Sequence, residues 1–207
     1  MSSLLQRLPP PISTPLRRLL RQPEDPRLEA AVSILAGCPL FACFRRADLY
    51  DLARHVHTRD YDRGEVIYFA RDPGLGLYVV VHGAVSLCTR CDDGGVGSAD
   101  DEVVHRVGPG GTFGERALLG EHRRATRAEA ADDTRVLGFF RPDFKTLIKR
   151  HPKLGTQVAL AVGQYLAARE ALLRDALSAS ESPVAVNRLL YGLRVPDGTC
   201  DPMLFFR

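Results

Sequence analysis

The sequence has no run of about 18 apolar residues, which a helix needs to cross a bilayer, so we expect no membrane span. Its charge excess is also small. Lys and Arg number 28 against 25 Asp and Glu, and the net charge of +3 is too low to indicate direct binding to nucleic acid. The histidines are scattered without a nucleophile partner, so we expect structural or surface roles for them and no enzymatic activity. They are His55, His57, His82, His105, His122 and His151.

Cysteine is scarce and its number is odd, and no secretory leader is visible, which favours a reduced, cytoplasmic compartment. Cys88 and Cys91 have C-x-x-C spacing, but a zinc site needs four converging ligands. No second pair of ligands lies nearby, although His82 and His105 could supply two of the four. We expect no metal site, and we expect a strand to end at Cys88 and lead into a hairpin loop. The five cysteines are Cys38, Cys43, Cys88, Cys91 and Cys200.

The two ends of the chain differ in composition from its middle. Residues 1–26 are basic and rich in proline, and Pro9 to Pro11 break any continuous helix there. We expect a disordered extension, with a targeting peptide or an interfacial helix as the alternative. Residues 181–207 form a tail with three Arg and no Lys, too short for a helix-turn-helix domain with its own core.

The middle of the chain changes from helical to strand-like periodicity. Apolar spacing predicts an amphipathic helix over 27–36 and a second short helix from about Arg46. From Thr58 to about Phe140, short runs of Val, Tyr and Phe alternate with glycine turns, which indicates a mainly β sandwich or barrel. A polar, glycine-rich loop covers 92–98. The clearest strand candidates are 66–70, 77–81, 85–87, 103–107 and 135–140.

Helical spacing returns after the last strand candidate. A short helix over 143–149 has Asp143 as its possible cap, and His151 and Pro152 end it. The longest helical pattern runs from Leu154 to about residue 180. Gly163 weakens it by up to ~1 kcal/mol relative to alanine.

One segment concentrates residues that suit an anionic ligand with a hydroxyl group. It is FGERALLGEHRRATR, residues 113–127. Gly114 permits close approach of backbone to a ligand, and the short turn over 117–119 presents N–H groups to an anion. Arg124 could return to the same anion with a bidentate contact. Glu115 cannot usefully face an anion, so we interpret it as an acceptor for a hydroxyl.

This segment resembles the phosphate-binding cassette of cyclic-nucleotide-binding domains, as in the catabolite activator protein and regulatory subunits of cAMP-dependent kinase. That family carries F-G-E-x-A-L, a spacer and then R-[SA]-A-[ST]. The resemblance continues in the turn YDRGEVI (61–67), the hairpin over 72–83 and the Gly108-Pro109-Gly110 turn, and it covers about residues 36–180. It implies a mainly β fold: a double-stranded β-helix, or jelly-roll-like β-roll, with N-terminal helices and a long C-terminal helix.

The resemblance also implies a site and a ligand, cAMP or cGMP, with no other cofactor. Glu115 would bind the ribose 2′-hydroxyl and Arg124 the cyclic phosphate, and backbone N–H groups around Ala117 and Ala125 would complete the phosphate cradle. The ligand-binding residues implied are Phe113, Gly114, Glu115, Arg116, Ala117, Leu118, Arg124, Ala125, Thr126 and Arg127.

Four positions depart from the family pattern. Arg127 stands where Ser or Thr is usual, and Thr126 where Ala is common. Arg123 replaces a frequent Pro, and Arg116 occupies a position that is often apolar. Arg127 could crowd the pocket or add a second phosphate contact.

The resemblance implies a domain over residues 27–180, without a recognisable output domain. We expect a non-enzymatic sensor in which rearrangement of the C-terminal helix changes affinity for an unidentified protein partner, with a homodimer through that helix as a possibility. Two alternatives stay open. One is a ligand-free scaffold of the same fold, and the other a transcription regulator that lacks its own DNA-binding domain.

Overall fold

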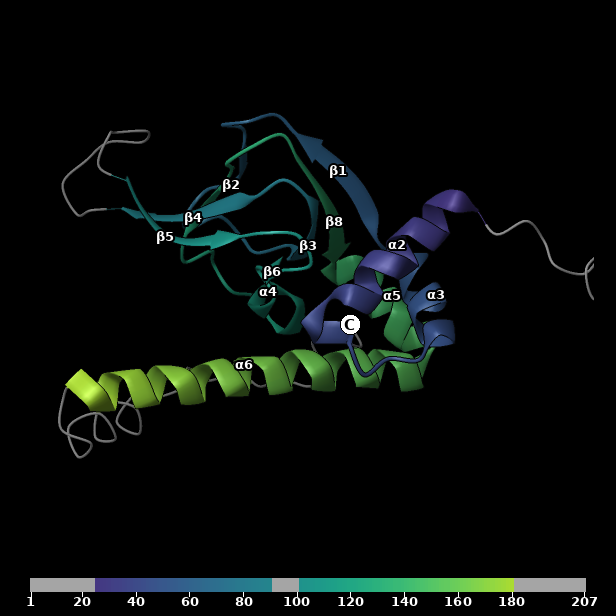
Figure 1. Cartoon of the computed structure of the whole chain (residues 1–207). Coiled ribbons are helices and arrows are strands. Elements are labelled where there is room, and N and C mark those ends of the chain that lie inside the picture. Colours follow the sequence, from purple (N-terminus) through teal and green to yellow (C-terminus); the bar gives the residue numbers. More distant parts are fainter. Residues whose placement is uncertain (1–24, 91–100, 181–207) are drawn as a thin grey trace, which may run out of the picture.

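The computed structural model describes residues 25–90 and 101–180. Two antiparallel four-stranded sheets form a roll, with helices packed at one end and a long helix running beneath it (Figure 1). This confirms the mainly β class with flanking helices. The predicted loop over 92–98, nearly all of the extension over 1–26, the tail over 181–207, and Cys91 and Cys200 lie outside the described residues.

The N-terminal helices confirm the predicted periodicity. Helix α2 (Pro26–Gly37) begins where the Asp25 side chain accepts a hydrogen bond from the Arg27 N–H at 2.9 Å, with Pro26 at its first position. Pro26 therefore starts a helix rather than closing the extension. A single 3-10 turn, η1 (Pro39–Phe41), leads to α3 (Arg46–Ala53).

All strand pairs in the two sheets are antiparallel. The first sheet has the order β1 (His57–Tyr61), β8 (Thr134–Phe140), β3 (Gly76–His82), β6 (Thr112–Phe113). The second has the order β2 (Val66–Tyr68), β7 (Arg127–Ala130), β4 (Val85–Arg90), β5 (Asp101–Val107).

Two strand ends differ from the prediction. β2 ends at Tyr68, where its register against β7 is already irregular. The expectation that a strand ends at Cys88 is wrong, because β4 continues to Arg90 and Cys88 pairs with Val103 of β5.

Strand β3 is buried on both faces. Successive side chains of a strand point to opposite faces. Leu77 and Val79 pack with the helices, whereas Tyr78 and Val80 pack between the two sheets. This explains the unbroken apolar run, and it places β3 where the helices and the roll interior meet.

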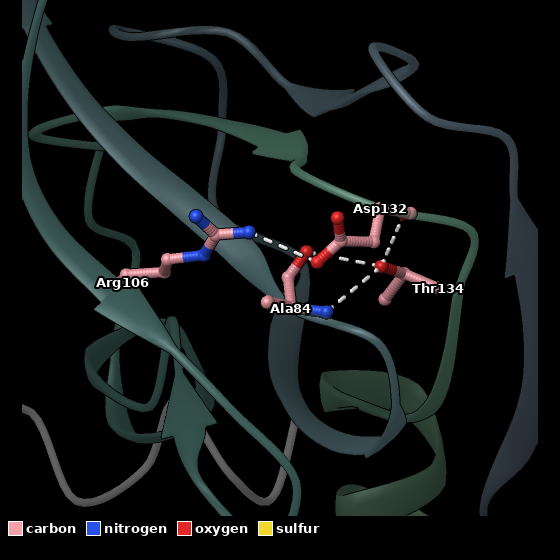
Figure 2. A network of polar contacts seen from close by, with 4 residues as sticks. All are labelled: Ala84, Arg106, Asp132 and Thr134. Atoms are coloured by element: carbon pink, nitrogen blue, oxygen red, sulfur yellow. Dashed lines mark hydrogen bonds and ion pairs between the residues drawn. The ribbon is translucent and has the colours of Figure 1, made fainter.

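A buried hydroxyl joins two turns at the far end of the roll (Figure 2). The Thr134 hydroxyl accepts a hydrogen bond from the Ala84 N–H at 3.2 Å and lies 3.0 Å from the Ala84 carbonyl oxygen and 2.7 Å from that of Asp132. The Asp132 carboxylate is in turn 2.9 Å from an Arg106 Nη of β5. The β3–β4 turn is thereby tied to the turn before β8.

The remaining helices are α4 (Arg116–Leu119), α5 (Arg141–Arg150) and α6 (Pro152–Ser180). Asp143 does not cap α5, because the helix begins two residues earlier. The Asp143 carboxylate instead lies within hydrogen-bonding distance of the His57 ring, 3.1 Å from its Nε2. Gly163 does not interrupt α6.

Helix α6 has two different halves. Its first half is buried against the other helices through Leu154, Val158 and Val162, whereas its second half is largely exposed (Figure 1). Within residues 25–90 and 101–180, no helix combines the length and hydrophobicity that a membrane span requires.

Candidate functional site

The site is built around Gly114, which lies between β6 and α4. Its φ of +78° falls in the left-handed region that favours glycine. A Cβ added there would lie 2.3 Å from Nη1 of Arg124 and 3.1 Å from the Gly76 carbonyl oxygen. Glycine is required at this position because the arginine side chain approaches the backbone so closely.

Arg124 is buried, with only 8% of its surface exposed. Its Nη1 donates to the Gly114 carbonyl oxygen at 3.0 Å, and its Nη2 donates to that of Gly76 at 2.8 Å. Its guanidinium carbon lies 4.2 Å from the ring centroid of Tyr68, a cation–π distance. The Arg124 Nε is buried and has no hydrogen-bond partner within the part of the chain that the structure describes. Buried donors are nearly always paired, so this atom marks a place for an outside acceptor.

Aromatic rings surround the Arg124 guanidinium from inside the roll. Tyr78 stacks on Phe113 with centroids 5.0 Å apart, and Tyr68 lies 6.1 Å from Phe113. Burial raises the pKa of both tyrosines, and the Arg124 charge opposes this shift. The phenols therefore stay neutral at neutral pH.

Glu115 is also buried, at 3% exposed, and its partner comes from α6. Its Oε1 accepts a hydrogen bond from Nη1 of Arg169 at 2.6 Å. The Arg169 side chain is itself 58% exposed. One side chain of the long helix thus reaches the carboxylate next to Gly114 and neutralises its charge.

The structure brings together most of the residues that the sequence singled out. Phe113, Ala117 and Leu118 are buried around the Gly114 turn. Arg116 and Ala125 are exposed, and Thr126 is half-buried.

Two of the three arginines that depart from the family pattern bind other groups of the protein. Arg127, half-buried on β7, forms an ion pair with Glu129. Arg123 is exposed and donates to the carbonyl oxygen of Arg71 at 2.9 Å.

Sequence reasoning missed four residues that shape the site. They are Tyr68, Tyr78, Arg141 and Arg169. Tyr68 and Tyr78 lie 45 and 35 residues before the 113–127 segment, and Arg141 and Arg169 lie 14 and 42 residues after it. None of the motifs in the sequence assigns these residues to the site. Only the packing of these elements brings them to the site.

Comparison with known proteins shows the family of the chain. A family model described as cyclic nucleotide-binding domain matches residues 58–151. The cyclic AMP receptor protein of Thermus thermophilus is 35% identical over 160 residues, which span 77% of this chain and 69% of that protein. The chain belongs to the cyclic nucleotide-binding domain family.

Other members of the family differ in what is attached to the domain. A cyclic nucleotide-gated potassium channel of Mesorhizobium japonicum is 30% identical over 121 residues, which span 58% of this chain but 31% of the channel. A solved cyclic nucleotide-binding domain from Methylobacillus flagellatus has a TM-score of 0.61 at 21% identity, covering 74% of this chain and 84% of that one. The latter likeness shows the fold alone, and it confirms the β-roll.

Proposed function

We propose that this protein is a non-enzymatic sensor that binds cAMP or cGMP at Arg124 and Glu115 and transmits occupancy through α6. The observation that carries the proposal is the pair of buried, oppositely charged side chains beside the Gly114 turn. Burying a charged side chain is costly. The contacts that keep Arg124 buried leave its Nε unpaired. A cyclic phosphate supplies the acceptor that this nitrogen lacks.

The second half of the site suits the sugar of a nucleotide. Arg169 binds one oxygen of the Glu115 carboxylate, and a carboxylate has several further lone pairs that accept hydrogen bonds. A ribose 2′-hydroxyl is a donor of the required kind. The same carboxylate would then contact the ligand and α6 together, which supports α6 as the element that responds to binding.

Titration calorimetry on the full chain tests binding directly. We expect cAMP or cGMP to bind the wild type with micromolar affinity, and 5′-AMP, which is not cyclic, to bind more weakly. Arg124→Lys keeps the charge but loses the planar fork, and we expect it to weaken binding about tenfold or more. Arg135→Lys is the matched control, because Arg135 also lies near a carboxylate, Asp60, but away from the site.

The scaffold alternative has its own support in the structure. Both terminal nitrogens of Arg124 already donate to backbone carbonyls, and these contacts hold the residue without a ligand. If neither cyclic nucleotide binds the wild type up to low-millimolar concentration, the sensor proposal is wrong for these ligands. A protein that stays folded under that result would be a scaffold of the same fold.

The exposed half of α6 supports a second copy of the chain as the partner. Leu172 and Leu173 of this half are 69% and 56% exposed. Large apolar side chains on one helix suit a two-fold helix pair, in which the same surface serves both subunits. We propose a homodimer through α6.

Sedimentation of the wild type and of Leu172→Glu tests the homodimer. We expect a dimer for the wild type and a monomer for the variant. Leu75→Glu is the control, since Leu75 is similarly exposed but lies outside α6. A wild type that stays monomeric at high protein concentration contradicts the homodimer and leaves a different protein as the partner of α6.

A further inference from the structure

Arg141 lies where the last strand becomes a helix, at the end of β8 and the start of α5. Its side chain is only 17% exposed, although it carries a full charge. Its backbone N–H donates to the Leu75 carbonyl oxygen at 2.8 Å. This bond places Arg141 beside the loop that connects β2 to β3.

The Arg141 guanidinium contacts the same loop and also the end of α4. Its Nε donates to the Ala117 carbonyl oxygen at 3.0 Å, and its Nη2 lies 2.7 Å from the carbonyl oxygens of both Gly74 and Gly120. Its Nη1 lies 3.3 Å from the Glu121 carboxylate. One side chain thus binds the carbonyl groups at the C-terminal end of α4 and a glycine of the β2–β3 loop.

The two segments that Arg141 contacts are also packed closely against each other. The Gly74 N–H donates to the His122 carbonyl oxygen at 2.9 Å, and a Cβ at Gly74 would lie 2.5 Å from that of Ala117. The loop before β3 therefore lies directly against α4 and the residues that follow it. Arginine suits this place because its planar fork offers five donors in fixed directions and carbonyl groups at a helix C-terminus attract a cation.

We propose that Arg141 is the positioning residue of the ligand site. It clamps the cassette, residues 113–127, against the β2–β3 loop at residues 74–76 and against the first turn of α5. The cassette holds Gly114 and Glu115, so the clamp fixes the end of the turn that carries both. The proposal deepens the proposed function of the cassette as a nucleotide site and rests on it.

The clamp also gives the cassette a rigid connection to the helices. Phe144 and Leu147 of α5 share one buried cluster with Leu154 and Val158 of α6. A shift of the cassette therefore displaces the start of α5, and α5 and α6 respond together. This connection is separate from the Glu115–Arg169 ion pair, which reaches α6 directly.

Amide hydrogen exchange on the full, ligand-free chain tests the clamp without any nucleotide. In Arg141→Lys and Arg141→Met we expect exchange over 114–122 and 74–76 to accelerate about tenfold or more, because the carbonyl contacts are lost. Helices α2 and α3 should exchange as in the wild type. The single side-chain nitrogen of lysine faces at least three acceptors, so Arg141→Lys should keep only part of the wild-type protection against exchange. The lysine variant also allows the test to be made if the methionine variant fails to fold.

Calorimetry with cAMP and cGMP supplies the second readout, and we expect about tenfold weaker binding by Arg141→Lys. Arg135→Lys, on the preceding strand β8, should change neither measurement. Exchange that stays within about twofold of the wild type, or that rises equally in every segment, overturns the clamp, because a role in global stability alone has that signature. If the wild type binds no nucleotide, the proposed function fails, and the exchange data still decide whether the clamp exists.

Discussion

Arg169 Nη1 lies 2.6 Å from Oε1 of Glu115, which joins the exposed part of α6 to a buried carboxylate 54 residues earlier in the chain. The two partners differ in environment. Removing the exposed arginine would leave an uncompensated charge inside the protein, whereas removing the carboxylate would leave a solvated arginine. This ion pair therefore helps to hold the second half of α6 against the site, in addition to the buried apolar contacts of its first half.

A double-mutant cycle on this pair measures that dependence. We expect Arg169→Ala to lower the free energy of unfolding by about 1–2 kcal/mol, a figure moderated by the exposure of the arginine. In the Glu115→Gln background the same change should cost less, because the buried charge is gone. Urea unfolding of the ligand-free chain provides the values. Equal costs in both backgrounds would show that the pair contributes nothing.

Two glycines should respond in opposite directions to alanine. Gly114→Ala forces a left-handed residue to carry a Cβ 2.3 Å from Arg124, and we expect a loss of about 1–3 kcal/mol together with weaker nucleotide binding. Gly163→Ala meets nothing within 4 Å inside α6, and it should stabilise the protein by up to ~1 kcal/mol. Thermal unfolding and calorimetry on both variants check the contrast. Unchanged binding by Gly114→Ala would mean that the turn does not hold the ligand.

The hydroxyl of Thr134 should contribute more to stability than that of an exposed threonine. Thr134→Val leaves the buried Ala84 N–H without its acceptor, and we expect a cost of about 1–3 kcal/mol. Thr156→Val is the control. Its hydroxyl donates to the Pro152 carbonyl oxygen at the exposed start of α6, and its removal should stay within about 0.5 kcal/mol. If chemical denaturation gave similar losses in the free energy of unfolding for both variants, the hydrogen bonds of the Thr134 hydroxyl in Figure 2 would not be important for stability.

Two histidines predict a loss of stability in mild acid. Burial lowers the pKa of His122, and the positive charges of Arg116 and Arg141 lower it further. Burial also lowers the pKa of His55, although Asp143 opposes the shift. The unfolded chain therefore binds more protons than the folded one below about pH 6.5, and stability falls as the pH drops through that window.

Melting temperatures between pH 7.5 and 5.5 test this sign. The melting temperature should fall less with decreasing pH in a protein that carries both His55→Gln and His122→Gln. His82→Gln, at an exposed strand end, should leave the pH dependence of the melting temperature as in the wild type. A wild type that becomes more stable as the pH falls over this range would contradict the prediction.

Local pattern predicted the order of the elements better than their ends. Apolar spacing placed α2, α3 and α6, because helices that pack on a core must repeat every three or four residues. Strands β1 and β7 were not recognised separately, because β1 is an exposed edge rich in polar residues and β7 alternates alanine with charged residues. The extent of β4 depends on its pairing with β5, which no local pattern specifies.

Short apolar runs between glycine turns were enough to predict a mainly β fold from the sequence. The β-roll and the nucleotide site were implied by the resemblance of residues 113–127 to the family's cassette, in which glycine, glutamate and arginine stand at the same spacing. Which residues contact the cassette could be seen only in the tertiary structure. The tyrosines of β2 and β3, Arg141 and Arg169 reach it from distant elements, since folding contacts depend on the packing of whole strands and helices. The tertiary structure also decided that Arg127 binds Glu129, because alternate residues of β7 share one face.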